Sequence, residues 1–266
     1  DAHDLAFALG ALSGSGSGTA AAMSGLSAAR RGRRLWLALI ATVAIACIVV
    51  VAAVAYLAGT RATGIGPPHA TRLTFDRGTV RTARFTPDGK TIVYGAAWNG
   101  DPITMFQTRL GSPESVRLPL PPSDVLAVSA TGEMAISIGR RFNYWVSEGT
   151  LARAPLVGNS FKEELEHVSA ADWSPDGTTL AIVRRVNGND RIEYPIGRVL
   201  YETTGYVSHP RVSPAGDAVA FLDHPVYNDN RGSVALVTTG GEKKTLTPAW
   251  SGEEGLAWSA AGDEIW

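Results

Sequence analysis

The stretch that decides the fold is Ala171-Asp-Trp-Ser-Pro-Asp-Gly-Thr-Thr-Leu-Ala-Ile182. It contains an aromatic anchor, a Ser-Pro-Asp-Gly turn and an apolar run. In the turn, Pro fixes φ, Asp hydrogen-bonds forward to the backbone, and Gly adopts the positive φ that a tight hairpin requires. The stretch therefore predicts two short strands joined by a tight turn.

The same pattern occurs five times between residues 83 and 266. The anchor residues are 43, 45, 39 and 46 residues apart, and they are Phe85, Val128, Trp173, Val212 and Trp258. Every copy keeps the turn glycine, at Gly89, Gly132, Gly177, Gly216 and Gly262, whereas the turn Asp occurs only at Asp88 and Asp176. One hairpin per period of roughly 40–50 residues is typical of a four-stranded propeller blade.

We therefore predict a mainly β fold over residues 71–266, an incomplete β-propeller of about four and a half four-stranded blades. Each anchor is expected to pack between adjacent blades. Leu73-Thr74 precedes Phe85 by the distance at which Leu246-Thr247 precedes Trp258. Such a Leu-Thr strand is expected to be an outer strand, so 71–75 is predicted to pair with strands beyond residue 266. The chain starts at Asp1 and stops within a repeat, and we interpret it as a fragment of a longer protein.

An uncharged apolar segment, residues 35–58, is predicted to be a transmembrane helix. At 1.5 Å per residue it reaches about 36 Å, enough to cross a bilayer. Arginines at 30, 31, 33 and 34 precede it, and Arg61 follows it. The positive-inside rule predicts a cytoplasmic N-terminus and an extracytoplasmic 59–266, in a single-pass inner (plasma) membrane protein. A cleaved signal peptide is the alternative, although its apolar region is normally about 7–15 residues.

Three shorter segments complete the predicted organisation. Residues 1–12 show a helical apolar face, predicted to be the last helix of a missing cytoplasmic domain. Residues 13–34 are a Gly/Ser/Ala linker ending in the Arg cluster, and residues 59–70 are a second linker. Cys47, the one cysteine, lies inside the apolar segment, so no disulfide or thiol-ligated metal site is expected.

The Ser-Pro-Asp-Gly repeats resemble the propeller of the TolB-like family. The segments 170–177, 192–201 and 208–216 resemble the extracytoplasmic region of bacterial transmembrane serine/threonine protein kinases, and His3 to Leu12 resembles the closing helix of such a kinase domain. The resemblance implies a kinase domain upstream of Asp1. ATP and Mg are expected only there, and no cofactor is expected in this chain.

No catalytic, cofactor-binding or metal residue is predicted. The chain has no nucleophile elbow, zinc motif or phosphate loop, and Gly64-Ile-Gly66 lies in a linker. His3 is interpreted as a helix-surface residue. His209 and His224 fall near successive strand ends and are expected to approach each other, either as satisfied loop histidines or, less favourably, as metal ligands.

Three polar clusters have two interpretations each. Residues 162–166, Lys-Glu-Glu-Leu-Glu, are interpreted as a solvated loop or short helix between blades, or else as a ligand-facing rim. Residues 187–190 and 228–230 are interpreted as turns, with Ca²⁺ binding through their oxygens as the alternative.

The functional hypothesis is a sensor propeller that binds an extracytoplasmic protein or small ligand and signals across the membrane to a kinase, by a change in homo-oligomeric association. The alternatives are the propeller of a membrane-anchored dipeptidyl-peptidase-like serine hydrolase and a non-catalytic TolB-like periplasmic scaffold. The net charge of −1 argues against nucleic acid as a partner. The expected partners are therefore the bilayer, through 35–58, and an unknown ligand at the propeller.

Overall fold

The structure is a computed structural model that describes residue 36 and residues 39–56, 70–112 and 114–266. The chain divides into two units, Asp1–Ala70 and Thr71–Trp266. In the first unit, the helix Leu39–Tyr56 is long and apolar enough to cross a membrane, and Cys47 is exposed on it. The predicted helix 1–12, the linker 13–34 and most of the linker 59–70 lie outside the described residues, as do the arginines on which the predicted orientation rests.

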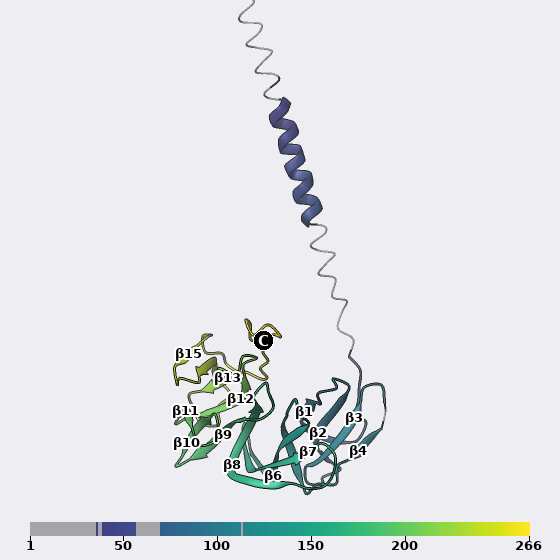
Figure 1. The fold of residues 1–266 in the computed structure, drawn as a ribbon, viewed down its shortest axis with the longest axis vertical. Coiled ribbons are helices and arrows are strands. Elements are labelled where there is room, and N and C mark those ends of the chain that lie inside the picture. Colours follow the sequence, from purple (N-terminus) through teal and green to yellow (C-terminus); the bar gives the residue numbers. More distant parts are fainter. Residues whose placement is uncertain (1–35, 37–38, 57–69, 113) are drawn as a thin grey trace, which may run out of the picture. The chain divides into compact units, whose positions relative to one another are not determined.

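The second unit contains fifteen strands in three antiparallel sheets (Figure 1). The first sheet has the order β1 (Gly78–Phe85), β2 (Thr91–Trp98), β3 (Thr104–Arg109) and β4 (Ser115–Arg117). The second contains β5 (Ser123–Val128), β6 (Glu133–Asn143), β7 (Val146–Pro155), β8 (Lys162–Trp173), β9 (Leu180–Val186), β10 (Asn189–Glu193) and β11 (Val199–Thr203). The third contains β12 (Tyr206–Val212), β13 (Ala218–His224), β14 (Ser233–Thr238) and β15 (Lys243–Thr245).

The seven-stranded sheet consists of two four-stranded meanders that share β8. β8 pairs with β7 from Lys162 to Val168 and with β9 from Val168 to Trp173. His167, directly before the shared residue, has a φ of 61°. The prediction of a loop or short helix at 162–166 is therefore wrong: the segment is an outer strand, and its charged side chains are mostly exposed.

The five predicted turns form as the repeat pattern indicates. The five turn glycines have φ between 63° and 88°, and each donates its N–H to the carbonyl three residues earlier. Asp88 Oδ1 accepts the N–H groups of Lys90 and Thr91, both at 2.9 Å, and Asp176 Oδ1 accepts that of Thr178 at 3.1 Å. The Thr86 and Ser174 hydroxyls, and after them these N–H groups, hold the pKa of both carboxyl groups below the usual range.

Each turn begins with a buried hydroxyl, which the repeat pattern by itself does not predict to be buried. The hydroxyl residues are Thr86, Ser129, Ser174, Ser213 and Ser259, and none is more than 8% exposed. Each makes a hydrogen bond of 2.5–2.9 Å to a side chain of its own turn, namely Asp88, Thr131, Asp176, Asp217 or Asp263. Two copies without Asp before the glycine have Asp directly after it. In these copies the hydroxyl hydrogen-bonds to the carboxylate that follows the glycine, Asp217 or Asp263.

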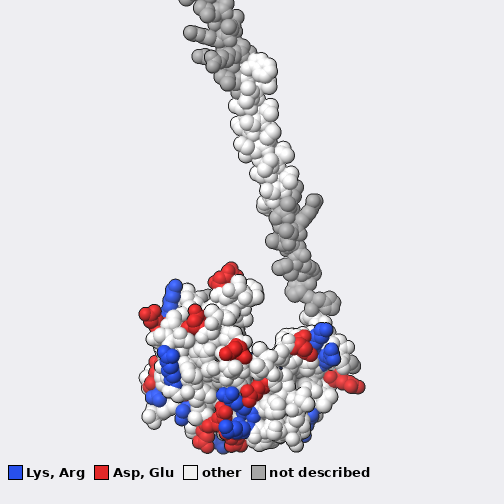
Figure 2. All heavy atoms as spheres, in the orientation of Figure 1, with Lys and Arg blue, Asp and Glu red and all other residues white. Residues whose placement is uncertain are grey.

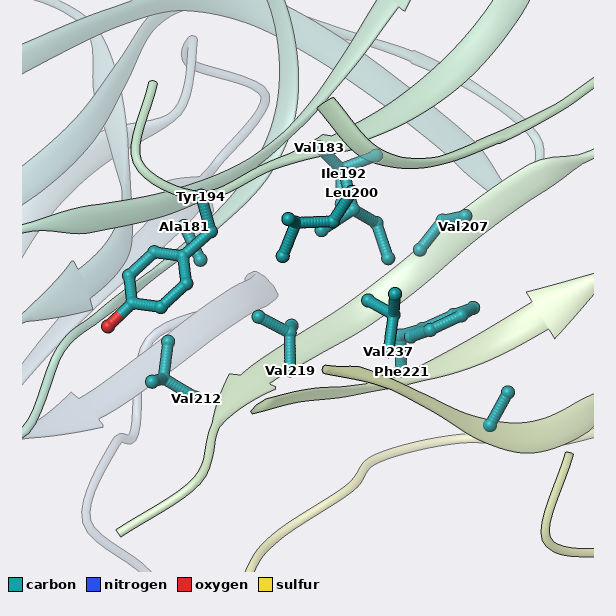
Figure 3. Close-up of a cluster of buried hydrophobic side chains, with 11 residues drawn as sticks. Ala181, Val183, Ile192, Tyr194, Leu200, Val207, Val212, Val219, Phe221 and Val237 are labelled. Carbon is teal, nitrogen blue, oxygen red and sulfur yellow. The ribbon is translucent and has the colours of Figure 1, made fainter. Parts of the chain in front are cut away.

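Successive meanders pack through apolar side chains on their facing surfaces. Figure 3 shows one such cluster, in which Ile192 and Leu200 of the third meander meet Val219 and Phe221 of the fourth. Burial of these side chains removes apolar area from water, which is the main favourable contribution to the association of the sheets.

The anchors follow this packing, with one exception. Trp173 is 6% exposed and packs against the preceding meander, and Val212 is 8% exposed in the cluster of Figure 3. Phe85 is 58% exposed, so the prediction that it packs between two blades is wrong for this anchor. It lies on the first sheet of the chain, and within the described residues no sheet precedes β1 to cover it.

Residues 71–75 form no strand in the structure. Their predicted pairing with strands beyond residue 266 stays a prediction. The matching segment at Leu246 does lie beside β14, because the Leu246 N–H donates to the Val234 carbonyl at 2.8 Å.

We expect Gly177→Ala to destabilise the protein more than Gly89→Ala. Both glycines have positive φ, which costs an L-residue about 1–2 kcal/mol. A Cβ at residue 177 would also lie 3.1 Å from Thr131 Cγ2 and 3.2 Å from Thr131 N, whereas a Cβ at residue 89 meets no described atom within 4 Å. Thermal unfolding of the full chain in detergent, followed by circular dichroism, measures the difference. Equal losses of Tm would contradict the predicted close approach.

Candidate binding site

A cavity of about 300 Å³ lies where the inner strands of the four meanders meet. Its wall is formed by β1, β5, β8 and β12, together with the hairpin between β6 and β7. These strands come from all three sheets, with β5 and β8 in the seven-stranded one, so the cavity exists only when the meanders are assembled side by side. We call it the central cavity.

Each of the four inner strands has an irregularity in its register, and the irregularity directs residues into the central cavity. The register shifts lie between Val80 and Thr82, Val125 and Ala127, Val168 and Ala170, and Ser208 and Arg211. The residues inside these shifts line the cavity, and they are Arg81, Leu126, Ser169, His209 and Pro210. A bulge changes which side chain points to which face of a strand, so it is a means of building a site on a regular sheet.

Four arginines line the central cavity: Arg81, Arg84, Arg140 and Arg211. Arg140 is fixed by its surroundings. Its Nη1 donates to Asp124 Oδ2 at 2.8 Å, its Nη2 donates to the Ser169 carbonyl at 3.2 Å, and both Nε and Nη2 contact Ser147 Oγ. Asp124 is fully buried and also accepts the Thr82 hydroxyl from the first sheet. This ion pair therefore ties together the inner strands of three meanders.

Arg84 and Arg211 lack such a pairing. Neither has a carboxylate within 4.0 Å among the described residues. Burial and, after it, the neighbouring Arg211 lower the pKa of Arg84 to about 10, and Asp172 opposes both effects. Burial in turn raises the pKa of the Asp172 carboxyl, against the effects of Arg211 and of the Val212 N–H, which donates to it at 2.8 Å.

Aromatic side chains lie beside these charges. Phe142 lies under the guanidinium groups of Arg81, at 4.4 Å from the ring centroid, and Arg140, at 5.2 Å. At the tip of the same hairpin, Tyr144 and Trp145 are 88% and 57% exposed, and both line the cavity. The Trp145 N–H donates to Asn228 Oδ1 at 3.0 Å, which connects the hairpin to the loop after β13.

His209 and His224 approach each other through Ser208, as their spacing predicts. Ser208 Oγ lies 2.8 Å from His224 Nε2 and 3.0 Å from His209 Nδ1. His224 Nδ1 lies 3.2 Å from the Arg231 carbonyl, which only accepts, so we assign the proton of His224 to Nδ1. Ser208 then donates to His224 and accepts from His209. Both histidines are thus satisfied members of one hydrogen-bond chain.

The hydrogen-bonded pair of Ser208 and His224 has the spacing of a serine nucleophile and its general base. It lacks the orienting carboxylate and the free oxyanion donors of such a site. His224 Nδ1 is oriented by a backbone carbonyl instead of a carboxylate. On the same strand, the N–H groups of Val207 and Val212 already donate to Asp190 and Asp172. They cannot stabilise an oxyanion while those bonds persist.

The other candidate residues have structural roles. Asp190, predicted to lie in an exposed turn at 187–190, is instead 2% exposed and binds Arg185 at 2.8 Å. Within 228–230, Asn228 accepts from Trp145, and Asp229 pairs with Arg231. In the described part of the chain, no group of three or more His, Cys, Asp or Glu side chains is arranged to hold a metal ion. His3 and Gly64-Ile-Gly66 lie outside the described residues.

The sequence did contain a signal for the arginines of the central cavity. Arg84 and Arg211 stand directly before the anchors Phe85 and Val212, and Asp172 stands directly before Trp173. Side chains alternate between the faces of a strand, so the residue before each anchor points to the face opposite the anchor. In three of the repeats this position holds a charged residue at or beside the central cavity.

We expect Arg140→Gln to destabilise the protein by about 3–5 kcal/mol, because it leaves Asp124 buried without its cation. Arg153→Gln is the matched control. Arg153 pairs with Glu133 and Glu164 near the surface, where an ion pair contributes about 0–1 kcal/mol. Thermal unfolding of both variants in the full chain measures the difference, and similar losses for the two would refute the role of the buried pair.

A pH dependence follows from His209. Burial lowers its pKa to about 4 in the folded protein, from 6.5, with Arg211 and Arg84 acting in the same direction. Glu254 Oε1 lies 3.8 Å from His209 Nε2, but this carboxylate is 75% exposed and solvent screens it. Between pH 6.5 and pH 4 the unfolded chain binds a proton that the folded chain does not, so this residue reduces stability as the pH falls. His209→Asn, which tolerates the φ of 52°, should lose less Tm than the wild type over this range. His224 is present in both proteins, so its titration does not contribute to the difference between them. Parallel Tm curves would contradict the prediction.

Comparisons with known proteins support the propeller fold. No family model and no curated protein sequence matches this chain. A putative TolB from Agrobacterium tumefaciens is similar in structure, with a TM-score of 0.57, 15% identity and coverage of 69% of this chain and 71% of that one. TolB from Acinetobacter baumannii has a TM-score of 0.55 and 18% identity, over 71% of this chain and 48% of that one. Residues 71–266 thus have a fold similar to that of TolB-like β-propeller proteins.

Proposed function

We propose that Thr71–Trp266 is a binding module, held at a membrane by the helix Leu39–Tyr56, whose binding site is the central cavity. We further propose that the module is the extracytoplasmic sensor of a transmembrane serine/threonine protein kinase. The observation that carries the binding function is the gathering of four arginines and an exposed aromatic hairpin around one cavity.

The charge in the cavity favours binding over a purely structural role. Burial, followed by the neighbouring Arg211, lowers the pKa of Arg84, so keeping the Arg84 guanidinium charged in the cavity costs folding free energy. A stability role would require a paired carboxylate for Arg84 and for Arg211, as Arg140 has in Asp124. Groups that are unfavourable for stability and gathered in a cavity are typical of functional sites.

The kinase assignment is supported by sequence. The segments 170–177, 192–201 and 208–216 resemble the outer regions of such kinases, and the order of stub, Arg cluster, apolar helix and propeller is the same. A Gly/Ser-rich sequence such as that within 13–34 is expected, from its composition, to transmit association of the membrane helices better than rotation or piston motion. We therefore propose clustering as the signal, with ATP and Mg bound by the kinase domain alone.

A TolB-like scaffold without signalling is the second candidate function, and the fold similarity to TolB favours it. The sequence encoded upstream of Asp1 separates the two. Our proposal requires a kinase domain there with His-Arg-Asp and Asp-Phe-Gly motifs, and a different upstream domain would leave the scaffold as the better assignment.

The binding function is tested by solute retention. The full chain in lipid nanodiscs is incubated with extracytoplasmic extract of the producing cell, washed, and analysed by mass spectrometry for retained solutes. We expect a retained species that is lost from the double variant Arg84→Gln, Arg211→Gln and kept by Arg117→Gln, whose side chain is exposed on β4. Identical retention by all three proteins would refute the cavity as the binding site.

A further inference from the structure

We infer that the central cavity binds a small organic anion whose carboxylate or phosphate group lies between Arg84 and Arg211, with its non-polar part near Phe142. This inference rests on the proposed function and adds the chemical class of the ligand. It depends on the donors, the charge and the size of the cavity.

The available donors are guanidinium groups. A guanidinium has five N–H donors in a planar fork. Arg84 Nη1 donates to the Ala83 carbonyl at 2.8 Å and Arg211 Nη1 to the Pro210 carbonyl at 2.7 Å. Each side chain is thus fixed by the backbone next to it, while other N–H groups of the fork remain for a ligand. A planar fork matches carboxylate and phosphate oxygens in a bidentate manner.

Backbone donors of β12 do not compete for this role. The N–H of Val207 donates to Asp190 at 3.2 Å, and the N–H of Val212 donates to Asp172 at 2.8 Å. Recognition of an anion at this strand therefore depends on side chains. Among the described residues that line the cavity, Arg84 and Arg211 are, together with Arg81, the guanidinium donors without an ion pair.

The charge balance of the cavity is positive. Four arginines face three carboxylates. Asp124 is bound to Arg140, Asp172 interacts electrostatically with both Arg84 and Arg211, and the exposed Glu254 lies 3.8 Å from His209 Nε2. Arg81 has no carboxylate within 4.0 Å among the described residues and contacts Phe142 instead. An anionic ligand would reduce the mutual repulsion of these cations, whereas a cationic or neutral ligand would not.

The size and the aromatic wall define the rest of the ligand. A volume of about 300 Å³ is at the lower end for small-molecule sites, so the ligand is a small molecule or a single terminal group. Phe142 and Trp145 supply flat apolar surfaces on the hairpin at the cavity. Such surfaces pack against a ring or another flat non-polar group.

Benzoate, benzamide and phenyl phosphate test the inference on the full chain in uncharged detergent micelles, by saturation-transfer NMR titration. Benzamide is the neutral counterpart of benzoate, and phenyl phosphate distinguishes a phosphate from a carboxylate site. We expect at least one anion to bind about tenfold or more tightly than benzamide. The double variant Arg84→Gln, Arg211→Gln should remove this preference, and Arg117→Gln should keep it.

A second variant covers the case in which the double variant does not fold. Arg211→Lys keeps the charge but removes the fork, and we expect it to weaken anion binding several-fold. Equal binding of benzoate, phenyl phosphate and benzamide would overturn the anion inference while leaving the cavity as a binding site. Binding of none of the three would also overturn it, and solute retention would then decide the proposed function separately.

Discussion

The structure depends on one repeated constraint, the tight turn that closes the inner hairpin of each repeat. The glycine takes a positive φ, and a buried hydroxyl at the start of the turn is satisfied by a side chain of the same turn. The turn fixes the register of the two strands that it joins. That register places the anchor side chain against the preceding sheet. The residue before the anchor then points to the opposite face of the strand. Arg84, Asp172 and Arg211 occupy this second position.

Buried carboxylates connect the sheets that the turns create. Asp124 accepts from Thr82 of the first sheet and pairs with Arg140. Asp172 and Asp190 accept N–H groups of β12, in the next meander. A buried carboxylate is costly unless it is paired or hydrogen-bonded, so these contacts form only when neighbouring meanders are correctly placed. The contacts that hold the inner strands together therefore also shape the central cavity.

The sequence allowed the fold to be predicted because its signal is local. Positive φ at Gly89 or Gly177 and the forward bonds of Asp88 and Asp176 depend on residues within one turn, and the structure confirms them. Predictions failed where the environment decides. The charged segment 162–166 became a strand because β7 offers an edge for pairing, and Phe85 stayed exposed because no described sheet covers it.

What the sequence by itself determined is the repeat, its turns, the apolar helix and the mainly β fold, since each follows from the properties of short segments. Only the tertiary structure decided where the binding site lies. Arg81 and His209 line the cavity because the register of β1 and of β12 is irregular at these residues. Arg84 and Arg211 interact although they belong to different sheets and lie more than one hundred residues apart in the sequence. Such meetings depend on how whole sheets are arranged around a common centre, and no single repeat contains that information.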